Sequence, residues 1–195
     1  MINIVSKFID EKSLCKSDNK LLVAISGGAD SVALFLCLKE LGYDIELAHC
    51  NFNLRGDESD NDEEFVKQLA DKFGVRLHLK SFDTQKYADE NKVSIQMAAR
   101  DLRYKWFNEL LVDNNLNYIA VGHHKNDDVE TFFINLTRGS GLKGLLGINS
   151  KNNNVIRPLL CVSRLEIEAY LSAVKQSFRE DSSNKSVKYL RNKIR

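Results

Sequence analysis

Apolar residues gather in short runs that alternate with longer segments in which apolar and polar residues recur at helical spacing. The runs predict strands and the longer segments predict helices. The expected strands cover residues 21–25, 45–50, 76–82 and 118–122, and the expected helices cover residues 31–41, 59–73, 94–112, 126–137 and 164–175. This alternation predicts an α/β fold with a doubly wound, mostly parallel sheet and helices on both faces.

The chain length suits one domain with a core of its own, because it has 195 residues of which 43% are apolar. We expect a single domain over residues 1–195, with an N-terminal helix at about 1–19 and a basic segment at about 175–195. No apolar stretch approaches the length of a transmembrane helix, and the first residues lack the pattern of a signal peptide. We therefore expect a cytoplasmic protein without a membrane partner. The four scattered cysteines fit reduced thiols.

Charge is unevenly distributed, although the net charge is only +1. Residues 175–195 hold seven basic and two acidic residues. Such a segment either contacts a phosphate backbone or forms a solvated tail, and charge alone does not separate these alternatives.

In residues 57–64, six of eight are acidic. We interpret them as an acidic helix start that complements the helix dipole, rather than as a metal site.

The most specific motif follows the first expected strand and reads Ser26-Gly27-Gly28-Ala29-Asp30-Ser31. A glycine-rich turn that opens a helix directs backbone N–H groups and the positive end of the helix dipole at one point, which suits a phosphate. A carboxylate at Asp30 would repel phosphate unless a cation lay between them, which predicts Mg²⁺ between Asp30 and a polyphosphate. The motif differs from the Walker A sequence.

Two further polar loops begin where expected strands end, at residues 49–55 and 123–130. Because the carboxyl ends of parallel strands meet at one edge, we expect three loops to converge on one crevice.

The helix at 126–137 has two unlike faces. Four apolar residues share the face that we expect to be buried, namely Val129, Phe132, Phe133 and Leu136. Asp127 and Glu130 lie on the opposite face, near His123 and His124. These carboxylates predict an active site that handles Mg²⁺ and substrate, whereas dipole complementarity and a zinc site are the alternatives.

Two arginines on the helix at 94–112 are candidates for binding phosphate. Arg103 lies at the edge of the apolar stripe and is favoured over Arg100, which lies further round. The alternative is that both are surface residues.

Together these motifs resemble those of the tRNA(Ile)-lysidine synthetases, which are N-type ATP pyrophosphatases of the PP-loop superfamily. The resemblance spans residues 20–195. In chain order, it is carried by residues 26–31, 49–55, 99–104, 122–131, 138–145, 157–160, 181–184 and 189–195. It implies the adenine nucleotide α hydrolase-like, Rossmann-like form of the α/β fold.

The resemblance implies a ligase that joins free L-lysine to the wobble cytidine of the CAU anticodon of tRNA(Ile). ATP would first adenylate the cytosine carbonyl oxygen and release pyrophosphate. The lysine ε-amine would then attack the ring carbon and expel AMP, which leaves lysidine. ATP and lysine are thus expected substrates, Mg²⁺ is the expected cofactor and tRNA(Ile) is the expected partner. The sequence does not fix the oligomeric state, and a homodimer is one alternative.

The resemblance also assigns roles to matching residues. The phosphate loop, composed of Ser26, Gly27, Gly28, Ala29, Asp30 and Ser31, would bind ATP together with His49 and Arg100. Asp30 and Asp127 would hold Mg²⁺ or orient the α-phosphate. Arg103 would steady the leaving pyrophosphate, and Glu130 would bind the lysine ammonium or take its proton. The candidate catalytic residues are therefore Asp30, Arg103, Asp127 and Glu130. Which carboxylate binds metal and which binds lysine is a family inference, because the spacing permits both.

The chain departs from the family pattern at Phe52 and Asn126, where members often carry His and Asp. Members also carry C-terminal tRNA-binding domains, which are absent from this sequence, so we expect a catalytic domain. Two rival hypotheses remain. One is another ATP pyrophosphatase such as a tRNA thiolase, which the lack of a C-x-x-C motif disfavours. The other is a nucleotide-binding module without chemistry, which would not need the Asp127 and Glu130 pair.

Overall fold

The computed structural model describes residues 1–139 and 146–179. Its strands form one sheet in the order β3-β2-β1-β4-β6-β5. All neighbouring pairs are parallel except β5 with β6. The strands are β1 (Lys20–Ala24), β2 (Asp44–Asn51), β3 (Leu77–Ser81), β4 (Tyr118–Ala120), β5 (Lys151–Asn152) and β6 (Val155–Ile156). The predicted, mostly parallel sheet is confirmed.

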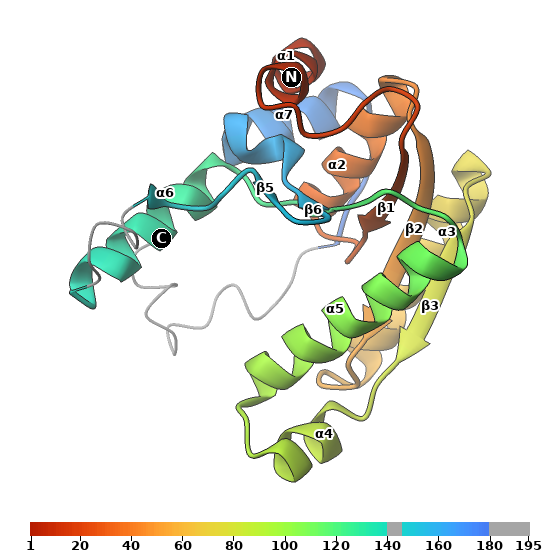
Figure 1. Cartoon of the computed structure of the whole chain (residues 1–195). Helices are drawn as coiled ribbons and strands as arrows, with labels where there is room; N and C mark the ends of the chain where they lie inside the picture. The colour runs from red at the N-terminus through yellow and green to blue at the C-terminus, as the bar shows by residue number, and fades with distance from the viewer. Residues whose placement is uncertain (140–145, 180–195) are drawn as a thin grey trace.

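Helices cover both faces of this sheet, with α5 on one side and α2 on the other (Figure 1). The helices are α1 (Ile2–Glu11), α2 (Ala29–Glu40), α3 (Asp57–Phe73), α4 (Thr84–Asn91), α5 (Ile95–Asp113), α6 (Lys125–Thr137) and α7 (Arg164–Ala173), with a 3-10 turn η2 (Pro158–Cys161). No described helix has the length and apolarity that crossing a membrane would require.

Each face of the sheet has its own core, because side chains alternate along the strands. From β1, Leu21 and Val23 join the core beneath α1, α2, α3 and α7, whereas Leu22 joins the core beneath α5. Residues 31–38 of α2 are all buried. The helix therefore lies deep in the first core, which fixes the loop that precedes it.

Several elements differ from the sequence-based expectation. The N-terminal helix ends at Glu11 rather than near residue 19. Helix α4 and the two-residue strands β5 and β6 were not predicted, because α4 has few apolar residues and strands of two residues show no periodicity. The motif residues 140–145, 181–184 and 189–195 lie outside the described residues, as does most of the basic segment at 175–195.

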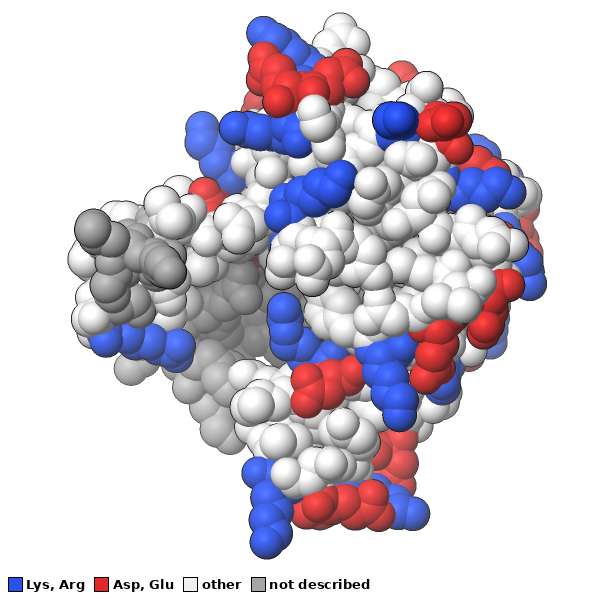
Figure 2. All heavy atoms as spheres, viewed as in Figure 1, with Lys and Arg blue, Asp and Glu red and all other residues white. Residues whose placement is uncertain are grey.

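On the face seen in Figure 2, basic and acidic side chains are interspersed rather than gathered by sign.

The predicted orientation of α6 is wrong. Val129, Phe132, Phe133 and Leu136 are between 38% and 51% exposed, whereas Asp127 and Glu130 are only 6% and 5% exposed. The reason is that α6 extends away from the sheet instead of covering it (Figure 1), and its nearest packed neighbour is η2. The face that carries the carboxylates therefore turns toward the protein.

A close approach at Gly122 sets the distance between the end of β4 and the first turn of α2. A Cβ atom at this position would lie 3.0 Å from the carbonyl carbon of Asp30 and 3.1 Å from the backbone nitrogen of Ser31. Only glycine fits without moving the backbone that carries the phosphate loop.

We predict that Gly122→Ala lowers the free energy of unfolding by about 1–3 kcal/mol, the usual cost of overpacking. Urea denaturation of both proteins measures the difference. Gly28→Ser is the control, since its Cβ would meet nothing closer than Ser26 Oγ at 3.5 Å. An unchanged unfolding free energy for Gly122→Ala would show that this contact does not constrain the fold.

Candidate functional site

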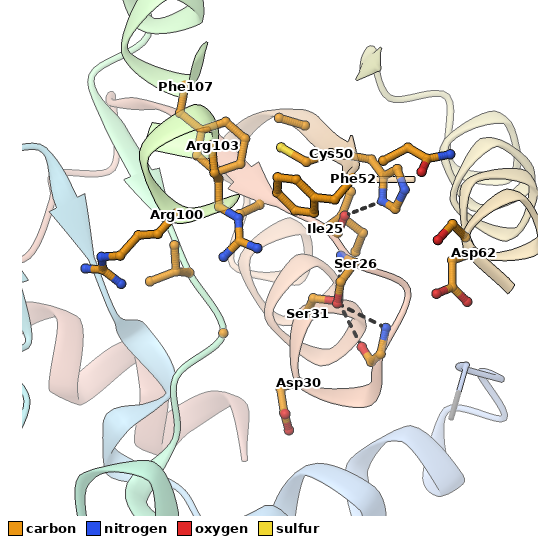
Figure 3. A pocket seen from close by; sticks show the side chains of 18 of the residues that line it. Ile25, Ser26, Asp30, Ser31, Cys50, Phe52, Asp62, Arg100, Arg103 and Phe107 are labelled. Carbon is orange, nitrogen blue, oxygen red and sulfur yellow. Dashed lines mark hydrogen bonds between the residues drawn. The ribbon is translucent and has the colours of Figure 1, made fainter. Parts of the chain in front are cut away.

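A cavity of about 420 Å³ opens where β1, β2 and β4 end (Figure 3). Its wall combines the loop after β1, the end of β2 with its following loop, one side of α5 and the segment after β4. Seven of the predicted site residues line it, namely Ser26, Gly28, Asp30, Ser31, His49, Arg100 and Arg103. Residues from all three predicted loops line this cavity, with His123 from the third, so the predicted convergence is confirmed.

The phosphate loop is tied by its own side chains. Ser31 Oγ donates to Gly28 O at 2.9 Å, and Ser26 N donates to Ser31 Oγ at 3.2 Å. Gly27 has φ +89°, a conformation that side chains disfavour, whereas Gly28 is an extended N-cap of α2 with φ −71°. The fold alone therefore requires glycine at 27 but not at 28. At position 28 the absence of a side chain leaves the N-terminus of α2 accessible to a ligand.

His49 fixes the strand that leads into this loop. Its Nδ1 lies 2.8 Å from the carbonyl oxygen of Ile25 and donates to it. Burial lowers the pKa of His49 despite this hydrogen bond and nearby carboxylates. At neutral pH the imidazole is therefore uncharged. It holds Ile25 by this hydrogen bond and does not attract a phosphate by charge.

Two predicted carboxylates converge on His124. Its Nε2 lies 3.7 Å from Asp30 Oδ2 and 3.6 Å from Asp127 Oδ2. His124 and Asp127 also cap α6, because each side chain accepts from the other's backbone N–H. This capping box is the role that sequence analysis did not assign to His124. It brings the first turn of α6 against the first turn of α2.

A cation already neutralises one of these carboxylates. Arg164, the first residue of α7, donates from Nη1 to Asp30 Oδ1 at 2.7 Å. Burial raises the pKa of Asp30, and the positive charge of Arg164 opposes that shift. Asp30 and Asp127 supply oxygen donors of the kind that Mg²⁺ prefers. Within residues 1–139 and 146–179, no three His, Cys, Asp or Glu side chains gather so that they could hold a metal ion by themselves, which disfavours the zinc alternative.

Glu130 lies one turn beyond Asp127, on the same buried face of α6. Neither carboxylate is among the residues that line the cavity. Gly27 and Ala29 also lie outside the lining.

The two predicted arginines of α5 are each held over an aromatic ring. The Arg103 guanidinium lies 5.1 Å from the ring centre of Phe52, and that of Arg100 lies 4.9 Å from the ring centre of Tyr104. Phe52 in turn stacks on Phe82 at 5.6 Å. Figure 3 shows Arg103 extending toward the middle of the cavity. Phe52 therefore positions a cation where the resembled family often has histidine.

Sequence analysis assigned no role to four charged residues at this site, namely Arg55, Asp62, Arg164 and Arg179, although it placed the loop that ends at Arg55 in the crevice. The acidic start of α3 is confirmed by Asp57, Glu58 and Asp60 in its first turn, but Asp62 is buried and lines the cavity. Its position four residues before Val66 and seven before Leu69, in the buried stripe, was the available signal.

Comparisons with known proteins agree with this geometry. A family model described as the PP-loop domain matches residues 2–195. The chain is 52% identical to the tRNA(Ile)-lysidine synthase of Bacteroides thetaiotaomicron over 98% of its length and 45% of that protein. It is 49% identical to that of Porphyromonas gingivalis, over 100% of this chain and 43% of that protein. It therefore spans less than half the length of these curated relatives.

A solved structure has the same fold. It is a U34-tRNA thiolase from Methanococcus maripaludis with its [4Fe-4S] cluster, which superposes with a TM-score of 0.77 at 19% identity. The match covers 99% of this chain and 69% of that one. At this identity the likeness concerns the fold alone.

We predict a pH-dependent contribution of His49 to stability. Its folded pKa is lowered, so below pH of about 6.5 the unfolded chain binds more protons than the folded one. Stability from this group is thus complete above that pH and falls on acidification toward the folded pKa. The variant His49→Asn keeps a donor for Ile25 but does not titrate there.

Urea denaturation of both proteins between pH 5 and pH 8 checks this. As the pH falls, the unfolding free energy of the wild type should decrease relative to that of His49→Asn. A difference independent of pH would contradict the buried, neutral state of His49.

Proposed function

The chain belongs to the PP-loop domain family, whose model covers residues 2–195, and from that premise we propose that it catalyses lysidine formation on tRNA(Ile). In this proposal ATP adenylates the wobble cytidine of the CAU anticodon and releases pyrophosphate. Free L-lysine then replaces AMP and forms a carbon–nitrogen bond. The names of the relatives at 52% and 49% identity support this choice of reaction.

One observation carries the proposal. Asp30 of the phosphate loop and Asp127 of α6 approach the same nitrogen of His124, and Glu130 is buried one turn further along. Buried ionisable groups gathered beside a phosphate loop are typical of active sites, which favours chemistry over simple nucleotide storage.

The phosphate groups of ATP would lie at the N-terminus of α2. The open side of Gly28 admits them, and the backbone N–H groups with the helix dipole attract their charge. Arg103 and Arg100, which line the same cavity, would stabilise the charge of the departing pyrophosphate.

Mg²⁺ fits the donors at this site, because Asp30 and Asp127 are carboxylates from two elements, and the negative charge of Asp127 helps to raise the pKa of Asp30. These two residues would hold the ion. When bound, Mg²⁺ would neutralise charge on the polyphosphate. Arg164, which pairs with Asp30 in the protein alone, would then turn to the phosphates or to Glu168, its second partner at 2.7 Å.

Glu130 would receive the lysine amine. The nucleophile must be a neutral amine, and a buried carboxylate near the reacting centre can bind the ammonium form and accept its proton. We keep the cytoplasm as the place of the reaction and a homodimer as an alternative to the monomer. Both stay predictions.

Thiolation is the less favoured activity. Cys50 is the cavity's cysteine, and burial raises the pKa of its thiol to about 12. A thiol that stays protonated is a poor sulfur carrier or metal ligand.

The test supplies ATP, labelled lysine and a tRNA(Ile) transcript with a CAU anticodon, with a methionine tRNA as control. We expect AMP and pyrophosphate in equal amounts and label in the isoleucine tRNA alone. Because the chain spans less than half of its relatives, the assay is run on this chain and on a full-length relative. AMP without lysine transfer in both would contradict the proposal and favour a sibling pyrophosphatase.

The variant Glu130→Gln separates an enzyme from a binding module. We predict at least a hundredfold loss of lysine transfer, typical of losing a general base, with ATP affinity within about twofold of wild type. Radiolabelled lysine incorporation and equilibrium ATP binding measure the two quantities. Full transfer activity in this variant would remove Glu130 from the mechanism.

The variant Gly28→Ser tests where the phosphates bind. Serine is a good N-cap, so we expect unchanged thermal stability. Its side chain would stand where phosphate must approach, so we predict a loss of ATP affinity of about tenfold or more. Calorimetric titration with ATP measures this, and wild-type affinity would place the phosphates elsewhere.

A further inference from the structure

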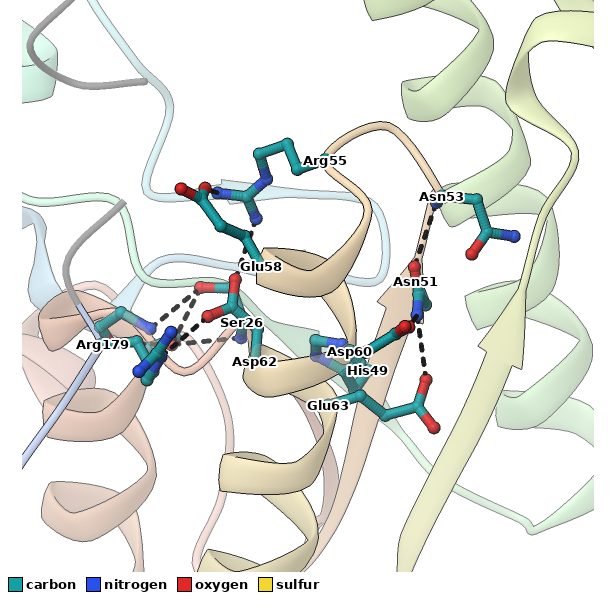
Figure 4. A network of polar contacts seen from close by, with 12 residues as sticks. Ser26, His49, Asn51, Asn53, Arg55, Glu58, Asp60, Asp62, Glu63 and Arg179 are labelled. Carbon is teal, nitrogen blue, oxygen red and sulfur yellow. Dashed lines mark hydrogen bonds and ion pairs between the residues drawn. The ribbon is translucent and has the colours of Figure 1, made fainter. Parts of the chain in front are cut away.

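A single buried carboxylate joins two arginines beside the phosphate loop. Asp62 Oδ2 accepts from Arg55 Nη2 at 2.9 Å, and Asp62 Oδ1 accepts from Arg179 Nε at 3.1 Å (Figure 4). The Asp62 side chain is 12% exposed, compared with 34% for Arg55 and 41% for Arg179. The three residues come from α3, the loop before it and the segment after α7.

Arg179 is attached to the phosphate loop by its backbone. Its N–H donates to Gly27 O at 2.9 Å, and it forms a parallel bridge with Gly28. Its Cγ lies 3.4 Å from where a Gly27 Cβ would stand. Asp62 therefore connects α3 to the segment that braces the loop.

Arg55 lies on the ligand side of this arrangement. It lines the cavity with Asp62 and with the loop residues Ser26 and Gly28. Its second acidic neighbour, Glu58, is half exposed, and Glu58 Oε2 lies 4.0 Å from Arg55 Nη1. The 2.9 Å bond to Asp62 helps to direct the guanidinium, which carries five N–H donors in a planar fork that matches phosphate oxygens.

From this geometry we propose that Arg55 is a further binding residue for the polyphosphate of ATP and that Asp62 is a positioning residue that aims it. The inference rests on the proposed function only in taking ATP as the ligand. Asp62 holds the flexible side chain of Arg55 at the cavity wall before ATP binds, so the binding of ATP need not order that side chain.

The variant Asp62→Asn separates this proposal from a purely electrostatic one, because the two predict opposite changes in the affinity for an anion. Replacing Asp62 by asparagine removes a negative charge near the loop, which by itself would strengthen the binding of an anion. If Asp62 acts by aiming Arg55, the same change weakens binding.

The experiment titrates the protein with ATP, with inorganic pyrophosphate and with adenosine. The variants are Arg55→Gln, Arg55→Lys, Asp62→Asn and the double variant Arg55→Gln with Asp62→Asn. Glu64→Gln is the matched control, because Glu64 is an exposed carboxylate on the same helix, bonded to Gln68 at 3.0 Å. Thermal unfolding monitors folding of each variant.

We expect Arg55→Gln to weaken pyrophosphate and ATP binding about 10–100-fold, as the loss of charged hydrogen bonds implies, and to leave adenosine binding unchanged. Asp62→Asn should weaken pyrophosphate binding about fivefold or more, but less than twofold in the Arg55→Gln background. Arg55→Lys should restore part of the affinity, and Glu64→Gln should have no effect.

Tighter pyrophosphate binding by Asp62→Asn, or additive effects in the double variant, would overturn the positioning role. Unchanged pyrophosphate affinity in Arg55→Gln would overturn the whole inference, and this exposed loop variant serves the test even if Asp62→Asn does not fold. Failure of the wild type to bind ATP or pyrophosphate would instead refute the proposed function.

Discussion

The parallel pairing of β1 with β2 on one side and β4 on the other is the constraint on which the site depends. Register pairs Leu21 with both Ile45 and Tyr118, so the three strands end at one edge and pass their loops to one place. The close fit of Gly122 against the first turn of α2 then fixes the depth of the phosphate loop. Backbone geometry, more than any side chain, therefore positions the loop that we propose binds phosphate.

Helix α6 shows how a site can override the pattern of its own sequence. Its apolar residues are exposed and its carboxylates are buried, the reverse of an ordinary surface helix. The His124 and Asp127 capping box directs the first turn toward Asp30 and thereby chooses the buried face. A conflict between pattern and burial of this kind is typical of functional regions.

The sequence predicted what depends on neighbours along the chain. Apolar runs located the four long strands, and the glycine-rich motif located the phosphate loop, because both signals are local. It could not predict contacts between distant polar residues. Asp30 and Arg164 are 134 positions apart, and Asp62 and Arg179 are 117 apart. No local sequence pattern predicts a pairing between residues so far apart in the chain. Asp62 carried a faint signal in its helical register and Arg55 belonged to a loop predicted to reach the crevice, whereas Arg179 was one charged residue among many.

The attachment of Arg179 to Gly27 has a consequence for the order in which the molecule is made. The phosphate loop is translated well before its brace, which lies 117 residues beyond even Asp62. At the usual rate of roughly 5–20 residues per second, the growing chain waits on the order of ten seconds for that partner. During the first part of this interval β1 also lacks β4, so the loop then exists without two of the supports that shape it. The ATP site is therefore completed only well after its signature motif has been translated.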